Sequence, residues 1–460
     1  MHPTGQIGDR WGMADLTKLL SARVPRYTSY PTAVQFHAGV TGDTHRNWIS
    51  SLPDGLPLSL YFHVPFCKQL CWFCGCHTHV ANTYRPVKAY LELIRAEMEL
   101  AARALPPGHK VQHIHWGGGS PTILQPADIE SFTASIRSLF DVAPDAEFAV
   151  EVDPRTITQA MADAFGRAGV NRASLGVQDC DTTVLAAVNR MQTIETTRDA
   201  VAMLRAAGVS RLNIDLMYGL PHQTVEGVCR TIDAVHEMRP DRLAVFGYAH
   251  LPSFKPQQAL IDEAALPGPD ERYAQYEAGR ARLQAHGYEA IGLDHFAWPD
   301  DQIAAAHRAR RLSRNFQGYT TDEAPVLIGF GSSAISAFPG GYTQNAVGMP
   351  EYRKAIMSGN FATSRGVELT ADDRLRRDVI SDLMCYGTCN LAQTAIRHGM
   401  GPGIFDDNFP AIDALAQDGL VERKGYRLRI PDGAHAGVRV VCAALDRYLS
   451  KAPTRHATAV

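Results

Sequence analysis

The sequence predicts an α/β fold: a partial (β/α)6 barrel with an N-terminal arm and a mainly helical C-terminal domain. From Leu58 onward, short runs rich in β-branched residues alternate with longer amphipathic stretches, the pattern of repeated strand–helix units. Six such units are too few to close an eight-stranded barrel, so we expect an open one. Polar or conformationally permissive residues follow several strands, which places an active site at the carboxyl ends of the strands.

Composition excludes several classes of partner and compartment. The 460 residues include 45 basic and 48 acidic side chains, and the formal net charge of −3 indicates neither nucleic acid nor an anionic membrane surface. No stretch approaches the roughly 18 apolar residues of a membrane span, and residues 1–26 lack a secretion signal. Nine cysteines, an odd and clustered set, favour a reducing compartment and metal chemistry. We therefore expect a cytoplasmic protein.

The predicted elements follow in order. The strands are Leu58–Val64, Val111–Trp116, Glu147–Val152, Arg172–Val177, Arg211–Met217 and Arg242–Tyr248. The helices between them are Val87–Leu105, Asp128–Phe140, Thr158–Ala168, Thr193–Ala207 and Thr224–Met238. Beyond Pro252 we expect a helix at Asp270–His286, a short strand at Ala290–Asp294, a turn at His295–Asp301 and a loop at Asn315–Thr321, followed by the glycine-rich stretch Gly329–Ile335.

Three domains are expected: an arm over 1–50, a catalytic domain over 51–365 with its barrel core at about 55–250, and a helical, winged-helix-like domain over 366–460. Two prolines and two tyrosines predict that the arm is extended around Tyr27 and Tyr30. The arm either packs on the domain or forms a lid whose Arg23 and Arg26 contact an anionic substrate. In the last domain, apolar alternation on both sides of Lys424-Gly425 predicts a β-hairpin.

Four of the nine cysteines, Cys67, Cys71, Cys74 and Cys76, lie in one loop after the first strand. Three residues separate the first pair and two the second, a spacing that suits an iron–sulfur cluster held by three thiolates with one iron left open. The alternative is a structural zinc ion, which would use all four thiolates in a tetrahedron. Cys76 is either a nearby residue that does not bind iron or a packing residue.

Other polar residues gather at the same expected rim. The run Gly117-Gly118-Gly119 follows the second strand and offers a bare backbone edge for a cofactor, although glycine triplets commonly mark only a turn. Glu151 ends the third strand, where a solvated carboxylate is the common case. Asp215 interrupts an apolar run and needs a partner, whether ligand or hydrogen bond. Arg190, expected on the helix after the fourth strand, is an ordinary surface arginine unless it binds an acid.

Four histidines surround this region, and metal ligation is the alternative to packing for each. A cluster with three thiolates needs none of them, so we expect supporting or packing roles for His63, His77, His79 and His115.

The motif Cys67-x-x-x-Cys71-Trp72-Phe73-Cys74-Gly75-Cys76 resembles the radical S-adenosylmethionine (SAM) superfamily, and within it the oxygen-independent coproporphyrinogen III oxidase (dehydrogenase) family. The resemblance spans nearly the whole chain. It includes Arg26–Thr32, His115–Gly119, Gly176–Asp179, Asp215–Pro221, Tyr248–Pro252 and Asn315–Tyr319.

The resemblance implies a site, residue by residue. Cys67, Cys71 and Cys74 would bind one [4Fe-4S] cluster, and two SAM molecules are expected. Tyr61, Gly118, Glu151 and Ile335 match first-SAM positions, whereas Phe73, Gly119, Ser120, Gln178, Arg190, Asp215 and Ala249 match second-SAM positions. Cys76, Tyr61 and Glu151 are the expected catalytic residues, with Cys76 not binding iron. On physical grounds, Arg23, Arg26, Gln317 and Tyr319 are candidates for holding the substrate carboxylates.

The activity implied is anaerobic oxidative decarboxylation of coproporphyrinogen III to protoporphyrinogen IX in haem synthesis. A 5′-deoxyadenosyl radical would remove a β-hydrogen from a propionate side chain. An external flavodoxin-like or ferredoxin-like electron donor and a monomeric protein are expected. Two positions depart from the family pattern: Ser120 stands where threonine is frequent, and Cys385–Asn390 follow it less closely, which leaves open any docking role of the last domain.

Two alternatives belong to the same superfamily. A haem-binding chaperone would keep the cluster but deliver haem, and such relatives have phenylalanine at the position of Cys76 and lack the long arm. A radical enzyme that opens or methylates haem is the other. Cys76 and the arm favour the oxidase.

Overall fold

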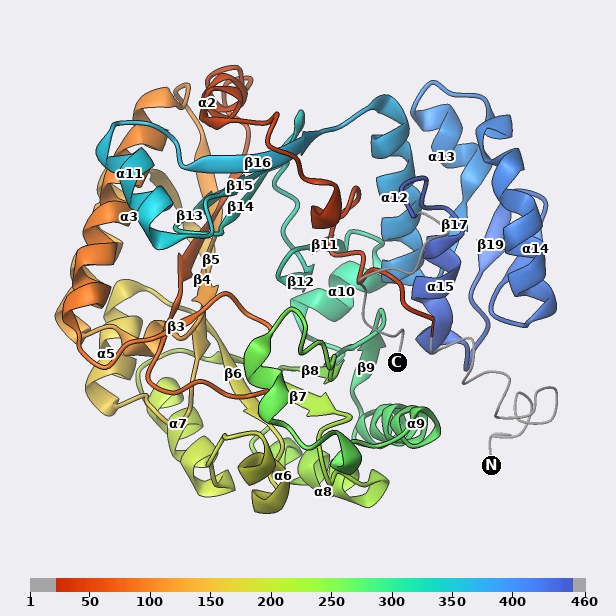
Figure 1. The fold of residues 1–460 in the computed structure, drawn as a ribbon, viewed down its shortest axis with the longest axis horizontal. Coiled ribbons are helices and arrows are strands. Elements are labelled where there is room, and N and C mark those ends of the chain that lie inside the picture. The colour runs from red at the N-terminus through yellow and green to blue at the C-terminus, as the bar shows by residue number, and fades with distance from the viewer. Residues whose placement is uncertain (1–21, 450–460) are drawn as a thin grey trace.

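The computed structural model describes residues 22–449. Its central feature is a twelve-stranded sheet in the order β16-β15-β14-β13-β1-β4-β5-β6-β7-β8-β10-β9 (Figure 1). The six predicted strands are confirmed as parallel neighbours: β1 (Leu58–Val64), β4 (Lys110–Gly118), β5 (Asp141–Val152), β6 (Arg172–Gln178), β7 (Arg211–Tyr218) and β8 (Arg242–Gly247). In the part of the chain that the structure describes, β16 and β9 are the two edge strands and do not pair with each other, so the barrel is open, as expected.

A seventh parallel strand lies beside β1. This strand, β13 (Val326–Phe330), pairs with β1 in register from Val326 opposite Leu58 to Phe330 opposite Phe62. The glycine-rich stretch Gly329–Ile335 starts within β13, which extends to Phe330, and ends where β14 begins at Ile335. All five residues of β13 are buried, which explains why its two faces give no alternating pattern.

Antiparallel strands extend both edges of the parallel sheet. On the β13 side these are β14 (Ile335–Phe338), β15 (Gly341–Asn345) and β16 (Thr363–Glu368). On the β8 side, β10 (His295–Ala297) pairs with β8 and with β9 (Glu289–Ile291). The turn expected to start at His295 is wrong over its first three residues, because buried Phe296 and Ala297 complete the sheet edge.

Amphipathic helices cover the outside of the parallel strands (Figure 1). They are α3 (Arg85–Ala104), α4 (Pro126–Leu139), α5 (Gln159–Ala168), α6 (Thr182–Ala187), α7 (Ile194–Ala206), α8 (Val225–His236) and α9 (Pro269–Ala285). Three begin at the expected threonine, since the hydroxyls of Thr158, Thr193 and Thr224 accept hydrogen bonds from the first turns of α5, α7 and α8. Among these seven helices, α6 is the one that the sequence did not predict.

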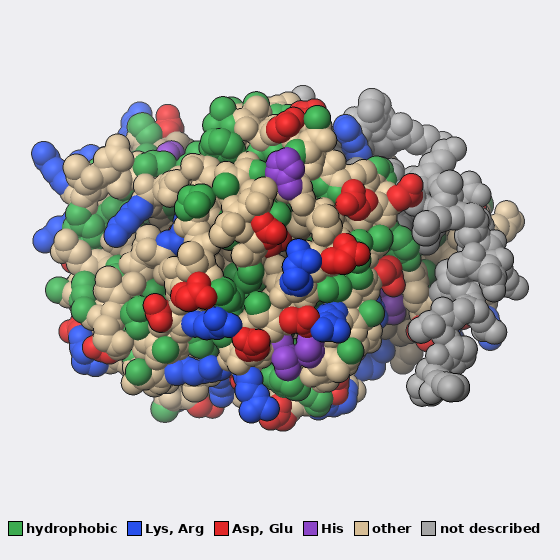
Figure 2. Space-filling model, turned by 90° about the horizontal axis from the view of Figure 1, so that it is seen from below, with side chains coloured by type: hydrophobic (Ala, Val, Ile, Leu, Met, Phe, Trp, Pro, Cys, Tyr) green, Lys and Arg blue, Asp and Glu red, His purple; other side chains and the backbone are tan. Residues whose placement is uncertain are grey.

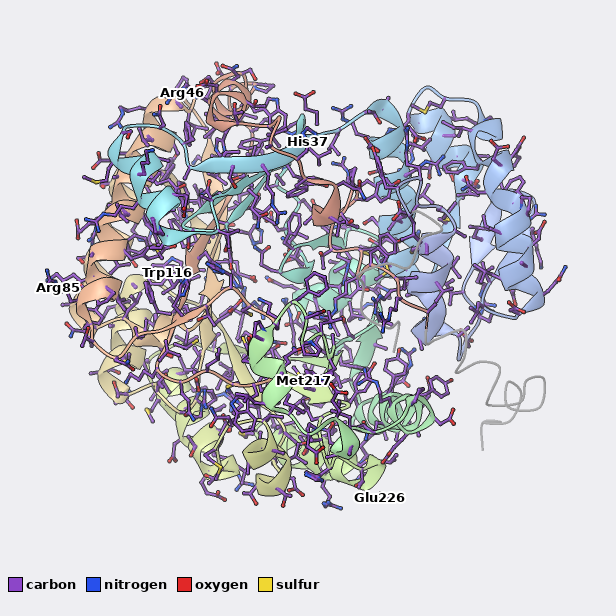
Figure 3. All side chains as sticks on the ribbon, in the orientation of Figure 1. His37, Arg46, Arg85, Trp116, Met217 and Glu226 are labelled. Atoms are coloured by element: carbon purple, nitrogen blue, oxygen red, sulfur yellow. The ribbon has the colours of Figure 1, made fainter. Side chains whose placement is uncertain are left out.

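The sheet is apolar toward the helices and polar toward the inside. Trp116 of β4 is fully buried against Phe132 of α4 and Phe148 of β5, with ring centroids 5.2 and 5.1 Å away (Figure 3). Strand β7 shows the alternation, because Ile214 is buried in the core whereas Asp215 lines the interior cavity. The interior of the open barrel can therefore hold a polar ligand.

A second hydrophobic core joins the C-terminal region to the N-terminal arm. Its elements are α12 (Ala371–Tyr386), β17 (Thr388–Asn390), α13 (Leu391–Arg397), α14 (Phe409–Gln417), β18 (Glu422–Lys424), β19 (Arg427–Arg429) and α15 (Val438–Ala443). The hairpin expected around Lys424-Gly425 is confirmed as β18–β19. Tyr27 and Tyr30 of the arm are part of this core. The domain limits themselves stay a prediction.

The arm is not extended throughout. Residues 1–21 lie outside the described residues, but α2 (Gly42–Ser50) is a helix that the sequence analysis missed. A capping box between Thr41 and Thr44 starts this helix, and buried Ile49 anchors it. The remaining short elements are β2 (Phe66–Cys67), β3 (His79–Val80), α10 (Gln302–Arg308), β11 (Ser313–Asn315), β12 (Gly318–Thr320) and α11 (Met349–Met357). The loop expected at Asn315–Thr321 is thus the β11–β12 hairpin.

The surface and the helices agree with the composition. On the face shown in Figure 2, acidic and basic side chains are interspersed. Among the helices of residues 22–449, none has the length and apolar character needed to cross a membrane.

A buried carboxylate links α3 to the loop after β13. Glu97 accepts hydrogen bonds from the Gly331 N–H at 2.7 Å, from Asn345 Nδ2 at 2.6 Å and from the Tyr352 hydroxyl at 2.7 Å. Burial raises the pKa of Glu97 from 4.5 to about 7, and these three donors only partly oppose the effect. The folded state therefore binds this proton more tightly than the unfolded state. Its contribution to stability falls as the pH rises from about 4.5 to about 7.

We predict that Glu97→Gln lowers the free energy of unfolding at pH 5 by about 1–3 kcal/mol, because its amide meets a ring of hydrogen-bond donors. In urea unfolding from pH 5 to pH 7.5, the difference in free energy of unfolding between wild type and variant should become smaller, since only the wild type loses stability as Glu97 ionises. Glu99→Gln, exposed on the same helix, is the control and should follow the wild type. Parallel curves for Glu97→Gln and the wild type would contradict the assignment.

Candidate active site

A cavity of about 410 Å³ lies on the inside of the open barrel, where the loops after β1, β4, β5 and β6 meet. Most residues singled out from the sequence line it: Cys67, Cys71, Phe73, Cys74, Cys76, Gly118, Gly119, Ser120, Glu151, Gln178, Arg190, Asp215, Gln317 and Tyr319. The lining does not include Arg23, Arg26, Tyr61, Ala249 or Ile335. The carboxyl ends of parallel strands thus bring together residues that are far apart in the sequence.

The cysteine loop is held by the turn that follows α6. The Trp72 N–H donates to the Val188 carbonyl at 3.0 Å, and Asn189 Nδ2 donates to the Leu70 carbonyl at 2.9 Å. Within the loop, the Cys74 N–H donates to the Cys71 carbonyl at 3.1 Å. These bonds fix the backbone that carries Cys71 and Cys74.

Arg190 is buried beside the loop and has a neighbouring acid, Asp153, so only its expected place on a helix is wrong. It follows α6 in the turn, and its side chain is only 6% exposed. Nη1 donates to Cys71 Sγ at 3.3 Å, while Nη2 contacts the Gly176 carbonyl and lies 3.5 Å from Asp153 Oδ1. A guanidinium that donates to this sulfur would offset the negative charge of a metal-bound thiolate.

Three further residues around the cysteines were missed by sequence analysis. Arg155 pairs with Asp153 at 2.7 Å, and its Nη2 donates to Cys71 Sγ at 3.5 Å. The Thr78 hydroxyl donates to Cys67 Sγ at 3.2 Å. The signal was present, because Asp153 and Arg155 directly follow the end of β5 at the rim. A soft donor set with hydrogen bonds to its sulfurs fits an iron–sulfur cluster.

Cys76 lies beside Cys74. A hydrogen bond from the Cys76 thiol lowers the pKa of Cys74 to about 7. Across residues 22–449 there is no group of three or more His, Cys, Asp or Glu side chains placed to hold a single metal ion. That Cys76 stays unbound by iron remains a prediction.

Glu151 is fixed as a carboxylate on the cavity wall. It accepts hydrogen bonds from the Gly118 N–H at 3.0 Å and from His115 Nε2 at 3.2 Å. Burial alone would raise the pKa of Glu151, but the hydrogen bond and charge of His115, together with the Gly118 N–H, hold it below its usual value. An ionised carboxylate facing a polar cavity can bind a ligand cation or hydroxyl.

Tyr61 lies behind this wall. Its hydroxyl is 3.0 Å from His63 Nδ1, and His63 Nε2 is 3.0 Å from the His77 carbonyl. Because a carbonyl can only accept, Nε2 carries the proton of a neutral His63, and Tyr61 donates to Nδ1. Of the expected histidine roles, the supporting one fits His63, His77 and His115.

Asp215 lies within β7, and Gln178 is the last residue of β6. Asp215 accepts hydrogen bonds from Ser174 Oγ at 2.8 Å and Asn213 Nδ2 at 2.7 Å, and burial raises its pKa to about 6. Gln178 has a φ of +75°, a conformation that non-glycine residues adopt only when their surroundings impose it. Both side chains line the cavity.

The three glycines allow close packing and do not leave an open backbone edge. A Cβ at Gly117 would lie 2.4 Å from Glu151 Oε1, and one at Gly118, whose φ is +109°, would lie 2.3 Å from His63 Nδ1. The Gly119 N–H is also occupied, donating to the Val64 carbonyl at 2.9 Å. These glycines let the end of β4 press against Glu151 and His63.

The expected residues outside the cavity lie in three places. Ile335 packs against Gly329, which pairs with Tyr61, so it lies behind the same wall. Ala249 and Arg26 line a separate, smaller cavity of about 40 Å³. Arg23 is exposed at the start of the described chain.

The inner end of the cavity carries charges that sequence analysis also missed. Arg172 lies 2.9 Å from Glu147, and Arg242 lies 2.7 Å from Asp301. Their positions alternate with core residues along the strands, so the period of two could have assigned Arg172, Glu147 and Arg242 to the inner face.

Comparisons with known proteins agree with this geometry. The pattern of the radical SAM superfamily matches residues 61–235. An oxygen-independent coproporphyrinogen III oxidase of Bradyrhizobium diazoefficiens is 46% identical over 438 residues, covering 95% of this chain and 97% of the relative. The chain belongs to the oxygen-independent coproporphyrinogen III oxidase family.

Two further comparisons support this membership. The family's Escherichia coli protein is 39% identical over 427 residues, covering 92% of this chain and 93% of that one. A solved structure of Escherichia coli coproporphyrinogen III oxidase, described as a radical SAM enzyme, superposes with a TM-score of 0.88 at 38% identity, covering 93% of this chain and 100% of that one. Membership of the radical SAM superfamily implies a [4Fe-4S] cluster and SAM.

We predict that Gly118→Ala lowers the free energy of unfolding of the protein. The left-handed φ alone costs about 1 kcal/mol, and the contact with His63 raises the loss to about 3 kcal/mol or more. Gly208→Ala is the matched control, because Gly208 also has a positive φ of +87° but has no atom within 4 Å of its Cβ position. Urea unfolding of the two variants should separate the cost of the positive φ, which both share, from the cost of the contact with His63, which only Gly118→Ala makes. Equal losses would show that the contact with His63 does not constrain Gly118.

Proposed function

We propose that the protein catalyses the anaerobic oxidative decarboxylation of coproporphyrinogen III to protoporphyrinogen IX in haem biosynthesis. The observation that carries the proposal is the convergence of Cys67, Cys71 and Cys74 on one polar cavity in a chain of this family. We further propose that it works in the cytoplasm as a monomer, with a flavodoxin-like or ferredoxin-like electron donor.

Cys67, Cys71 and Cys74 would hold the cluster, and Arg155, Arg190 and Thr78 would donate hydrogen bonds to its thiolates. When bound, the cluster and SAM supply one-electron reduction and a 5′-deoxyadenosyl radical that removes a hydrogen from the β-carbon of a propionate. Guanidinium groups beside thiolate sulfur stabilise the more negative, reduced state of such a centre. The protein's own contribution is thus electrostatic.

Glu151 and Tyr61 would position the first SAM molecule. The Glu151 carboxylate faces the cavity and is held by Gly118 and His115, so it can accept a hydrogen bond from a ribose hydroxyl or an ammonium group. Because an ammonium group only donates hydrogen bonds, contacts from Gly118 and Gly119 to it would come from their carbonyl oxygens. Tyr61 and Ile335 would form the apolar backing of the same subsite.

A second SAM molecule is also proposed. Gln178, Arg190 and Asp215 line the same cavity, with Phe73, Gly119 and Ser120 close to the cysteine loop. Their mixture of a cation, a carboxyl group and an amide matches the ammonium, carboxylate and hydroxyl groups of SAM. Ala249 would contact this molecule from the neighbouring smaller cavity. The hydroxyl of Ser120 keeps the hydrogen-bonding capacity of the family's frequent threonine.

The haem-binding chaperone is the second candidate function, and Cys76 argues against it. The thiol is retained at the cavity beside Cys74, where chaperone relatives are expected to have phenylalanine. We propose that Cys76 acts in the reaction without binding iron.

We predict that Cys67→Ser, Cys71→Ser and Cys74→Ser each lose the visible iron–sulfur absorbance and the bound iron, because serine is a poor ligand for this soft centre. Cys76→Ser should keep both and lose coproporphyrinogen turnover. Cys229→Ser, on α8 away from the site, is the control and should keep cluster and activity. Full iron content in all three ligand variants would overturn the assignment.

The function is tested by anaerobic reconstitution with iron and sulfide, followed by incubation with coproporphyrinogen III, SAM and dithionite. We expect two molecules of carbon dioxide per substrate and a product with the mass of protoporphyrinogen IX, both dependent on SAM. Stoichiometric haem binding without carbon dioxide release would favour the chaperone. A product in which haem is methylated or opened would favour the third alternative.

A further inference from the structure

A cluster of arginines surrounds the cavity of about 40 Å³ on the far side of Phe246 from the cysteines. The described residues that line it include four arginines from four separate segments and a single acidic residue, Asp294. The arginines are Arg26 of the arm, Arg272 of α9, Arg314 of β11 and Arg439 of α15. The arm, the barrel and the C-terminal region all contribute to it.

The guanidinium groups are oriented by backbone carbonyls. Arg26 donates to Gly247 at 3.2 Å, Arg272 to Tyr248 at 2.8 Å, and Arg314 to Tyr27 at 3.2 Å. Arg439 donates to Pro25 at 2.9 Å and is only 5% exposed. Carbonyls satisfy N–H groups but do not neutralise charge.

The charge around this cavity is unbalanced. Within residues 22–449, no carboxylate lies at ion-pair distance from Arg26, Arg272 or Arg314. Asp294 is itself bonded to His295 at 2.7 Å. Arg272 and Arg314 are half-buried, and Asp294 is the one described carboxylate among these guanidinium groups, so the arrangement favours a bound anion. Burial and the neighbouring Arg26 and Arg314 also lower the pKa of Arg439 to about 10.

The cavity lies between two larger ones. Phe246 also lines the cavity of the cysteine loop, and Arg314 also lines a third cavity of about 460 Å³ between the arm, β12 and α12. A cavity of about 40 Å³ has room for a carboxylate group but not for a larger body. A bulky ligand in either neighbouring cavity could therefore extend one carboxylate into it.

We propose that Arg26, Arg272, Arg314 and Arg439 form the subsite that anchors a propionate carboxylate of the tetrapyrrole other than the one that reacts. This rests on the proposed function. Coproporphyrinogen III carries four propionates, and a tetrapyrrole together with SAM needs more room than the 410 Å³ beside the cysteines. Guanidinium groups bind carboxylates through paired hydrogen bonds. Anchoring a distant carboxylate fixes which propionate points toward the cysteines.

The test measures binding without turnover, using coproporphyrin III, the stable oxidised form with four carboxylates. Arg272→Gln and Arg26→Gln should each weaken its Kd by about tenfold or more, the expected effect of losing one charge-assisted hydrogen bond. Binding of the coproporphyrin III tetramethyl ester and of SAM should stay unchanged. Arg272→Lys should recover most of the affinity. Thermal unfolding shows whether each variant is folded. If the Arg272 variants do not fold, Arg26→Gln alone tests the subsite, because Arg26 is exposed and makes one hydrogen bond to a carbonyl at 3.2 Å.

Arg205→Gln is the matched control, because Arg205 also donates to a backbone carbonyl, that of Arg239 at 2.9 Å, but lies exposed on α7. It should bind coproporphyrin III as the wild type does. If Arg26→Gln and Arg272→Gln bind coproporphyrin III with unchanged Kd, the subsite is overturned. Turnover by the wild type would still support the proposed function. Weakened SAM binding instead would assign the subsite to the carboxylate of SAM and overturn the proposal. A wild type with neither turnover nor coproporphyrin III binding would overturn both.

Discussion

The site depends on one buried interaction, that of the Arg190 guanidinium with Cys71. A cation in this position must be paired, since burying it alone would cost several kcal/mol. Asp153 supplies the charge, the Gly176 carbonyl fixes the orientation, and the sulfur of Cys71 accepts a hydrogen bond from Nη1. The three partners come from the end of β6, the end of β5 and the cysteine loop after β1. One side chain therefore sets the distance between the cysteines and the rim that would bind SAM.

The same rim requires an interior unlike that of most parallel sheets. Parallel strands are normally apolar on both faces, because helices or packed layers cover both. Here the outer face packs on helices, whereas the inner positions of β5 and β7 carry Glu151 and Asp215, each held by donors from neighbouring strands. Paired in this way, carboxyl groups can be buried without loss of the fold, and the interior stays hydrophilic enough for charged cofactors.

Sequence reasoning succeeded where a local signal exists. Alternation of short and long patterns located the six strands, and threonine caps located the starts of α5, α7 and α8. It failed where tertiary pairing decides the outcome. Strand β13 is buried on both faces and has no period, and β10 becomes a strand only because β8 offers an edge. The loop at 315–321 likewise becomes a hairpin through pairing with residues that precede it.

The site shows the same division. The cysteines, Glu151 and Asp215 could be found from spacing and from their position at strand ends. Thr78 could not, because threonine is common on surfaces and only its contact with Cys67 shows that it lies beside the site. Arg155 and Arg172 were missed although their places after β5 and on the inner face of β6 could have indicated them. Arg190 was misplaced for a further reason. The short helix α6 ends before it, and the turn that follows directs the side chain inward.

The arm connects these observations. Its two expected roles, packing on the domain or meeting an anionic substrate, are not exclusive. The carbonyls of Pro25 and Tyr27 accept hydrogen bonds from Arg439 and Arg314, so the bonds that pack the arm also orient those two cations. They also bring Arg26 to the same cavity. An extended segment suits this task, because a helix would have used these carbonyls for its own hydrogen bonds. The proline- and tyrosine-rich sequence of the arm thus leaves the backbone free to assemble a cationic site between the barrel and the C-terminal region.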